Sequence, residues 1–164
     1  MNNFSNPITS RIVAFLREIG LAVQARDLPQ STFLPGILIE NGGLVIDEGR
    51  LLYPGDLLHE AGHLAVAPAT LRPQLSDNVS SDPAEELMAI AWSYAALVRL
   101  GLDPQVLFHS EGYKGGGDSL IENFTSGHYI GLPMLQWVGM TLDDRRASEQ
   151  GLPPYPHMLR WLRE

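Results

Sequence analysis

The chain has 164 residues, of which 45% are apolar and 18% charged, which is typical of one folded domain over residues 1–164 and not of a disordered chain. Its 11 basic and 19 acidic residues give a net charge of −8, and repulsion by phosphate backbones excludes direct nucleic-acid binding. The chain has no cysteine, which excludes disulfides and thiolate metal sites, so that a bound metal must use His, Asp or Glu.

The N-terminal segment predicts a helix and no targeting signal. Asn6 is suited to an N-cap, Pro7 to a first turn and Gly20 to a stop, so we expect a helix from Pro7 to Ile19. The segment lacks a basic region followed by a long apolar stretch, and the most apolar run, residues 87–98, is too short to span a bilayer. We therefore expect a cytoplasmic protein without a membrane partner.

Residues 37–47 predict a β-hairpin. Two short β-rich runs flank Asn41, Gly42 and Gly43, and Asn and Gly tolerate the positive φ that a tight turn requires. The next segment predicts a helix, because Pro54 suits a first helical turn and Pro68 must end the helix.

The second half of the chain predicts mainly helices. Asp82 and Gly101 delimit a helix from Pro83 to Leu100 that is apolar on nearly every face, which predicts a buried position. Shorter helices are expected at residues 104–108, 120–126 and 133–138, with a last turn near the C-terminus. Together with the hairpin, these elements predict an α+β fold in which a small sheet packs against several helices.

The segment LLHEAGHLAV, residues 57–66, carries His59 and His63 four residues apart. On a helix they share a face and can bind one ion together, and zinc accepts imidazole nitrogen. Glu60 lies about 100° further round the helix, beside the ion without binding it, where it can take a proton from a metal-bound water. The alternative is a pair of histidines that caps the helix or fills a surface. The spacing favours a catalytic zinc site.

A third ligand is needed, and the start of the second helix offers Glu85 and Glu86. With Asp82 as N-cap, Glu85 falls at the third helical position and can bond back to the capping residue. Glu86 has no such role, and an acid on the apolar stripe with Ile90 needs a partner. We favour Glu86, and Glu85 is the alternative.

HEAGH followed by a glutamate-led helix resembles the gluzincin type of zinc metallopeptidase. Over residues 37–100, the order of hairpin, short loop, HEAGH and EELMAIAWSYAAL is most similar to the ImmA/IrrE-like metallopeptidases. In that family the second helix supplies the third ligand from an E-x-x-A-x-x-aromatic pattern, which Glu86, Ala89 and Trp92 fit. Ile90 stands where the family usually has Asn or Asp, and the C-terminal third of the chain matches no pattern of the family.

The resemblance implies a zincin-like fold in which Zn²⁺ is bound by His59, His63 and Glu86. It also implies a peptidase that hydrolyses peptide or protein substrates, with Glu60 as general base. The alternative is a non-catalytic, metal-stabilised binding or regulatory protein on the same scaffold. A structural site needs a closed ligand set and no base, so Glu60 favours the enzyme.

The resemblance also gives the hairpin a possible role. In zincins an edge strand near the metal pairs with an extended peptide. Residues 36–40 or residues 43–47 would serve here, and the alternative is an ordinary covering hairpin.

The remaining histidines and the glycine-rich residues 110–119 offer donors for an oxyanion. The candidates are Tyr113, His109 and His128, of which we prefer Tyr113 and His128, whereas His157 is expected to be an ordinary surface or packing residue. The glycine-rich segment is either a mobile lid that carries Tyr113 or a plain connector that never approaches the metal.

Overall fold

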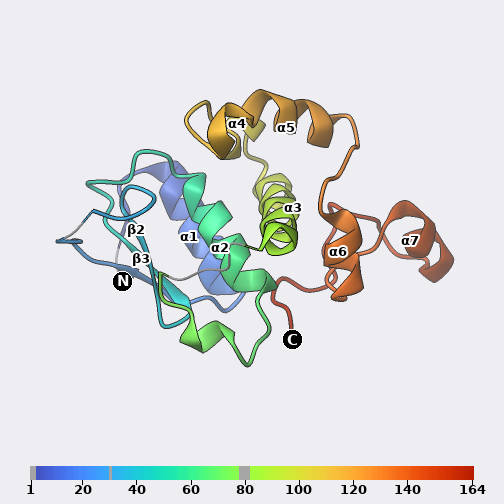
Figure 1. Ribbon diagram of the computed structural model, residues 1–164, viewed down its shortest axis with the longest axis horizontal. Helices are drawn as coiled ribbons and strands as arrows, with labels where there is room; N and C mark the ends of the chain where they lie inside the picture. The colour runs from blue at the N-terminus through green and yellow to red at the C-terminus, as the bar shows by residue number, and fades with distance from the viewer. Residues whose placement is uncertain (1–2, 30, 78–81) are drawn as a thin grey trace.

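The computed structural model describes residues 3–29, 31–77 and 82–164, which form an α+β fold, as predicted (Figure 1). The elements in chain order are α1 (Pro7–Glu18), β1 (Val23–Ala25), β2 (Ile37–Glu40), β3 (Gly43–Ile46), α2 (Asp56–Val66), the 3₁₀ turn η1 (Arg72–Gln74), α3 (Pro83–Leu100), α4 (Pro104–Leu107), the 3₁₀ turn η2 (Tyr113–Gly115), α5 (Gly117–Thr125), α6 (Leu132–Trp137) and α7 (Asp144–Gln150). Figure 1 shows α3 at the centre, with α4 and α5 across one end and α6 and α7 on the side away from the sheet. None of the helices in these described ranges is both long and apolar enough to cross a bilayer.

The predicted hairpin is confirmed. β2 and β3 are antiparallel, and Asn41 and Gly42 join them with φ of 50° and 75°, the left-handed values of a two-residue hairpin turn. A third strand, β1, pairs parallel with β3 and was not predicted. The order β1-β3-β2 makes β3 the central strand. Residues 43–47 therefore cannot pair with a peptide, and β2 is the strand of the hairpin with an outer edge.

One face of the sheet packs on the helices. Ile37, Ile39, Leu44 and Ile46 are buried in the same apolar core as α1, α2 and α3, whereas Leu38 and Val45 cover the opposite face with Leu28. This alternation is the period of two expected of a strand. It turns Ile37 and Ile39 of β2 towards the core that also contains the HEAGH helix.

α2 and α3 pack closely because Gly62 lies between them. A Cβ at Gly62 would lie 2.8 Å from the Ala89 carbonyl oxygen and 3.0 Å from Ser93 Oγ. The Ser93 hydroxyl is within hydrogen-bonding distance of the Leu58 carbonyl on α2 (3.0 Å) and of the Ala89 carbonyl (2.6 Å). The small residues in HEAGH and at position 89 thus set the distance between the two helices that carry the candidate ligands.

We expect Gly62→Ala to lower the free energy of unfolding. Overpacking costs about 1–3 kcal/mol, which exceeds the gain of up to about 1 kcal/mol from the higher helix propensity of alanine. Chemical denaturation measures the difference. Gly49→Ala is the matched control, because a Cβ at Gly49 meets Asp47 Oδ1 at an ordinary 3.5 Å. Equal stability of Gly62→Ala and wild type would contradict the close packing.

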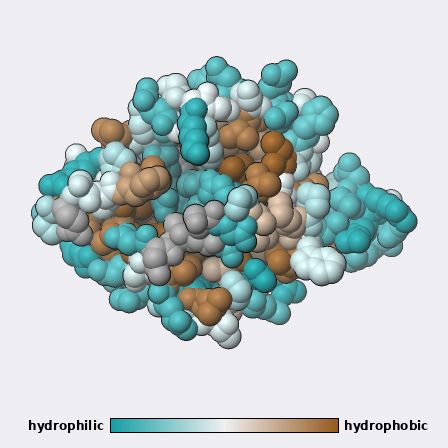
Figure 2. Space-filling model, in the orientation of Figure 1, coloured by the Kyte–Doolittle hydropathy of each residue, from teal (hydrophilic) through white to brown (hydrophobic). Residues whose placement is uncertain are grey.

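The short helices after α3 lie near the predicted positions, with α5 beginning three residues before the expected residue 120. α7 was not predicted, and the residues after it, 151–164, contain turns and no helix. Figure 2 shows α7 as a hydrophilic projection, so no apolar stripe marked it in the sequence. Asp143 caps it by accepting a hydrogen bond from the Arg146 N–H (2.8 Å).

The C-terminal residues close the end of α2. The Trp161 carbonyl accepts a hydrogen bond from Trp92 Nε1 (2.9 Å), and the Arg163 N–H donates to the Ala65 carbonyl (2.9 Å). The Arg72 guanidinium donates to the carbonyls of Leu64 (2.8 Å), Ala67 (3.0 Å) and Arg163 (2.6 Å). The bonds to Leu64, Ala65 and Ala67 satisfy carbonyl groups that the last turn of a helix leaves unpaired, so the HEAGH helix is held at its C-terminal end.

Candidate metal centre

The three residues predicted as metal ligands converge. His63 Nε2 lies 3.3 Å from His59 Nε2 and 2.9 Å from Glu86 Oε2, and His59 Nε2 lies 3.4 Å from Glu86 Oε1. One ligand atom from each residue lies within 4.8 Å of the other two, and the group does not include Glu85. This arrangement favours Glu86 over Glu85 as the third ligand.

The spacing of these atoms fits a metal ion. Tetrahedral ligands at roughly 2.0–2.1 Å from a zinc ion are about 3.3–3.4 Å apart. The two imidazole nitrogens are 3.3 Å apart, and each has a different oxygen of Glu86 as its neighbour, at 3.4 Å from His59 and 2.9 Å from His63. Two imidazole nitrogens and a carboxylate that point at one another are also the donor types that divalent cations prefer. His59, His63 and Glu86 can therefore hold a metal ion.

The helices create this geometry locally. His59 and His63 stand one turn apart on α2, which ends at Val66 because Ala67, the residue before Pro68, is extended (φ −68°, ψ 142°). Asp82 caps the start of α3, because its carboxylate accepts a hydrogen bond from the Ala84 N–H (2.9 Å). Glu86 therefore lies one turn into the helix, opposite His63.

The surroundings hold His59 and Glu86 in the protonation states that bind a cation. It lowers the pKa of His59 to about 4, helped by the nearby His63 and opposed by the Glu86 charge, so His59 is neutral at pH 7 and keeps a lone pair. The pKa of Glu86 is lowered, chiefly by its hydrogen bond with His63, so Glu86 is ionised. The site thus holds a neutral imidazole and a carboxylate, the forms in which these groups bind metals.

Glu60 lies beside this group but is not part of it. It is 9% exposed, and burial raises its pKa to about 7, with the charges of Asp56, Glu86 and Asp77 adding to the effect and His63 opposing it. Its carboxylate makes no hydrogen bond or ion pair with any residue that the structure describes. A buried carboxyl group without a partner is a candidate for proton transfer.

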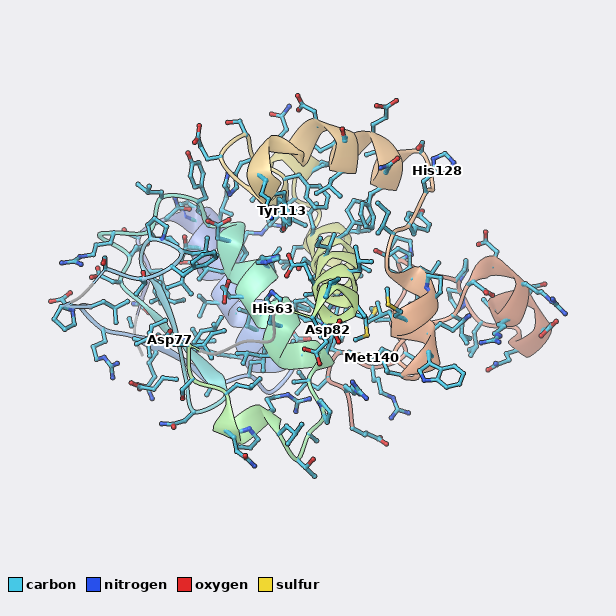
Figure 3. All side chains as sticks on the ribbon, viewed as in Figure 1. His63, Asp77, Asp82, Tyr113, His128 and Met140 are labelled. Carbon is cyan, nitrogen blue, oxygen red and sulfur yellow. The ribbon has the colours of Figure 1, made fainter. Side chains whose placement is uncertain are left out.

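A cleft of about 680 Å³ opens over the ligands and Glu60. Ile37 and Ile39 of β2 form part of its wall, together with the ligand group and Glu60. The lining consists of Phe33, Leu34, Ile37, Ile39, His59, Glu60, His63, Asp77, Pro83, Glu86 and Lys114. Figure 3 shows His63 on α2 in the middle of the molecule. The cleft is large enough for several side chains of a bound peptide.

Two of the remaining histidines are excluded from this centre. His128 is exposed beyond α5, where its Nδ1 lies 3.2 Å from Ser126 Oγ, and Figure 3 shows it far from His63. The preference for His128 as an oxyanion donor is therefore wrong, because α5 carries it away from the ligands. His157 is exposed, as predicted.

His109 is bound by a residue that the sequence analysis missed. Its Nε2 lies 2.6 Å from Asp56 Oδ1, and its ring stacks on Tyr53 with centroids 3.8 Å apart. Asp56 precedes His59 by one turn, so the helical spacing is the signal that would have identified it. His109 Nε2 is paired with the Asp56 carboxylate on α2, and His109 does not belong to the ligand group.

Tyr113 reaches the outer side of a candidate ligand. Its hydroxyl lies 3.2 Å from His59 Nδ1, the ring nitrogen that does not face His63 and Glu86. Burial raises the pKa of Tyr113 well above its usual value, so the phenol stays protonated. The idea of a connector that never approaches the centre is therefore wrong. Closure of residues 110–119 as a lid stays a prediction.

No family model, curated protein or solved structure matches the chain. The resemblance to ImmA/IrrE-like metallopeptidases and the zincin-like fold therefore stay predictions. The case for a function rests on the geometry and chemistry of the centre itself.

Proposed function

We propose that the protein is a zinc-dependent metallopeptidase, with His59, His63 and Glu86 as zinc ligands and Glu60 as general base. The observation that carries the proposal is Glu60, a buried carboxyl group with a raised pKa that lines the same cleft as three convergent ligand atoms without joining them. A structural zinc site is normally closed by four protein ligands, whereas a catalytic site has three and a base nearby.

The donor set favours zinc. Two imidazole nitrogens and one carboxylate oxygen, without a thiolate, are a common catalytic zinc set. Zinc supplies Lewis acidity, which polarises a carbonyl group and acidifies water. A bound Zn²⁺ ion would more than offset the single negative charge of Glu86, and the resulting positive charge would favour the ionised form of Glu60.

Glu60 moves the proton in the proposed reaction. Its carboxylate takes a proton from the attacking water as the water oxygen bonds to the peptide carbonyl carbon. The same oxygen of Glu60 then gives the proton to the amide nitrogen as the C–N bond breaks. The proton that remains on the former water oxygen passes to the departing amine, so that the products are a carboxylate and an ammonium group, and Glu60 is restored.

β2 offers a place for the main chain of a substrate. Ile37 and Ile39 turn their backbone groups away from β3, because bonded pairs alternate along an antiparallel ladder. Asp77 N–H donates to the Ile39 carbonyl (3.0 Å), and Ile37 N–H donates to the Leu34 carbonyl (3.2 Å). The Ile37 carbonyl and the Ile39 N–H lie between these bonds and have no partner within the described part of the chain. They support the binding of an extended peptide.

The test is cleavage of a diverse peptide library, followed by mass spectrometry. We expect the zinc-loaded protein to produce fragments, the chelated protein to produce none, and restored zinc to recover cleavage. Cleavage sites should be enriched beside apolar residues, because the cleft is lined by residues such as Phe33, which is 98% exposed. An intact library with zinc bound would instead favour a non-catalytic, metal-stabilised binding protein.

A further inference from the structure

The ring of His59 is held between two sets of groups. Its Nε2 points to His63 and Glu86, at 3.3 Å and 3.4 Å, and its Nδ1 lies 3.2 Å from the Tyr113 hydroxyl. The rings of His59 and Tyr113 are also nearly perpendicular, with centroids 5.3 Å apart. Tyr113 therefore contacts His59 from the side opposite the proposed ligand group.

Residues 113 and 114 adopt an unusual backbone to place this hydroxyl. Tyr113 and Lys114 have φ of 55° and 54°, the left-handed region that is unfavourable for residues with a Cβ. Strain of this kind persists where the surroundings enforce it. Here the Tyr113 ring packs on Phe108 as well as on His59, with centroids 5.3 Å apart, so packing fixes the phenol from two sides.

A second link joins the same segment to α2. Asp56 Oδ1 lies 2.6 Å from His109 Nε2, both side chains are about nine-tenths buried, and Tyr53 stacks on the histidine ring. Asp56 and His59 are three residues apart on α2, and their partners, His109 and Tyr113, are four residues apart on the segment. The two links are therefore parallel, and the Asp56–His109 pair anchors the backbone that carries Tyr113.

We propose that Tyr113 is a positioning residue for the metal ligand His59, and that the Asp56–His109 pair holds Tyr113 in place. This inference rests on the proposed metal site. With a cation on Nε2, the proton of His59 must sit on Nδ1, and this N–H donates to the Tyr113 oxygen. Partners on the second ring nitrogen fix the tautomer and the ring orientation of a ligating histidine.

Tyr113→Phe tests the inference with zinc alone as the probe. The variant removes the hydroxyl but keeps the ring on Phe108, so we expect the metal-free protein to remain folded, with the small loss of stability that one hydrogen bond contributes. Zinc affinity, measured by competition with a chelating dye, should fall about 10- to 100-fold, the usual effect of losing such a partner. In the zinc-loaded wild type, the His59 Nδ1–H should give an NMR signal protected from solvent exchange, and this protection should be lost in the variant.

Tyr129→Phe is the matched control. Tyr129 belongs to an aromatic cluster with Tyr94, Phe124 and Tyr155, and its hydroxyl makes no hydrogen bond to a described residue. The control should bind zinc like wild type. Equal zinc affinity in Tyr113→Phe and wild type, or an equal loss in both tyrosine variants, would overturn the positioning role.

A double-mutant cycle tests the anchor. His109→Ala should weaken zinc binding in the wild-type background and have little further effect in the Tyr113→Phe background, because the pair acts through Tyr113. Additive losses would overturn the anchor. These readouts do not require catalysis, so a protein that binds zinc through Tyr113 but cleaves no peptide would refute the proposed function and support the positioning role. A wild type that binds no zinc would refute both.

Discussion

Glu60→Gln is expected to retain zinc and to lose peptide cleavage. Removal of a general base typically lowers the rate about 10²- to 10⁴-fold, and the amide of glutamine cannot accept and return the proton. Glu60 is outside the group formed by His59, His63 and Glu86, so zinc stoichiometry should stay at the wild-type value. The peptide-library assay and elemental analysis measure the two quantities on the same samples. Cleavage at the wild-type rate would refute Glu60 as the base.

The same variant should stabilise the metal-free protein at alkaline pH. The folded-state pKa of Glu60 is about 7, raised from 4.5 chiefly by burial. The stability linked to this group is therefore fully present below pH 4.5 and is lost as the pH rises through 7. A pKa shift of this size corresponds to a loss of roughly 3 kcal/mol in the free energy of unfolding. Glutamine does not titrate, so the variant avoids this loss.

The difference in stability between wild type and Glu60→Gln isolates the contribution of Glu60. The pKa of His59 is lowered in the fold from 6.5 to about 4, so its contribution is present above pH 6.5 and is lost as the pH falls towards 4. His59 is present in wild type and in Glu60→Gln, and its contribution cancels in the difference. Denaturation from pH 5 to pH 8 should therefore show that the stability gain of Glu60→Gln grows with pH. A gain that does not change with pH would refute the raised pKa.

The parts of the centre that the sequence predicted are those set by local geometry. His59 and His63 share a helical face whatever the rest of the chain does, and the Asp82 cap fixes the phase of α3 and so separates Glu86 from Glu85. The hairpin followed from Asn41 and Gly42, because few other residues accept their φ values. Each of these predictions depends on residues within one or two turns of each other.

The parts that were missed depend on contacts between distant residues. His109 meets Asp56 across 53 positions, and Tyr113 meets His59 across 54. The helical spacing places Asp56 on the face of His59, but no local pattern shows which distant residue either side chain meets. β1 has three residues and exists because β3 offers it a partner; so short a run has no periodicity to detect. Tertiary packing decides whether such contacts form. The residues that support the ligands, His109 and Tyr113, could therefore be identified only from the structure.

Zinc is expected to bind with one ion per chain and to stabilise the fold, and the two adjacent glutamates provide a matched test. A ligand that binds the folded state stabilises it by about 4 kcal/mol when present at 1,000 times its Kd. The unfolded chain should bind zinc only weakly, because it has no cysteine and only five histidines. Wild type and Glu85→Gln should both show one zinc and this stabilisation, whereas Glu86→Gln should lose most of both.

The contrast between the two glutamate variants follows from their positions on α3. Glu86 lies 2.9 Å from His63 Nε2, and a neutral amide there removes the negative charge that a cation requires. The same change at Glu85 alters the charge of the chain equally but leaves the ligand group intact, so it controls for charge. His63→Ala, which removes a ligand from α2, should match Glu86→Gln. Elemental analysis and zinc-dependent unfolding measure the outcome; loss of zinc in Glu85→Gln with retention in Glu86→Gln would move the third ligand by one residue.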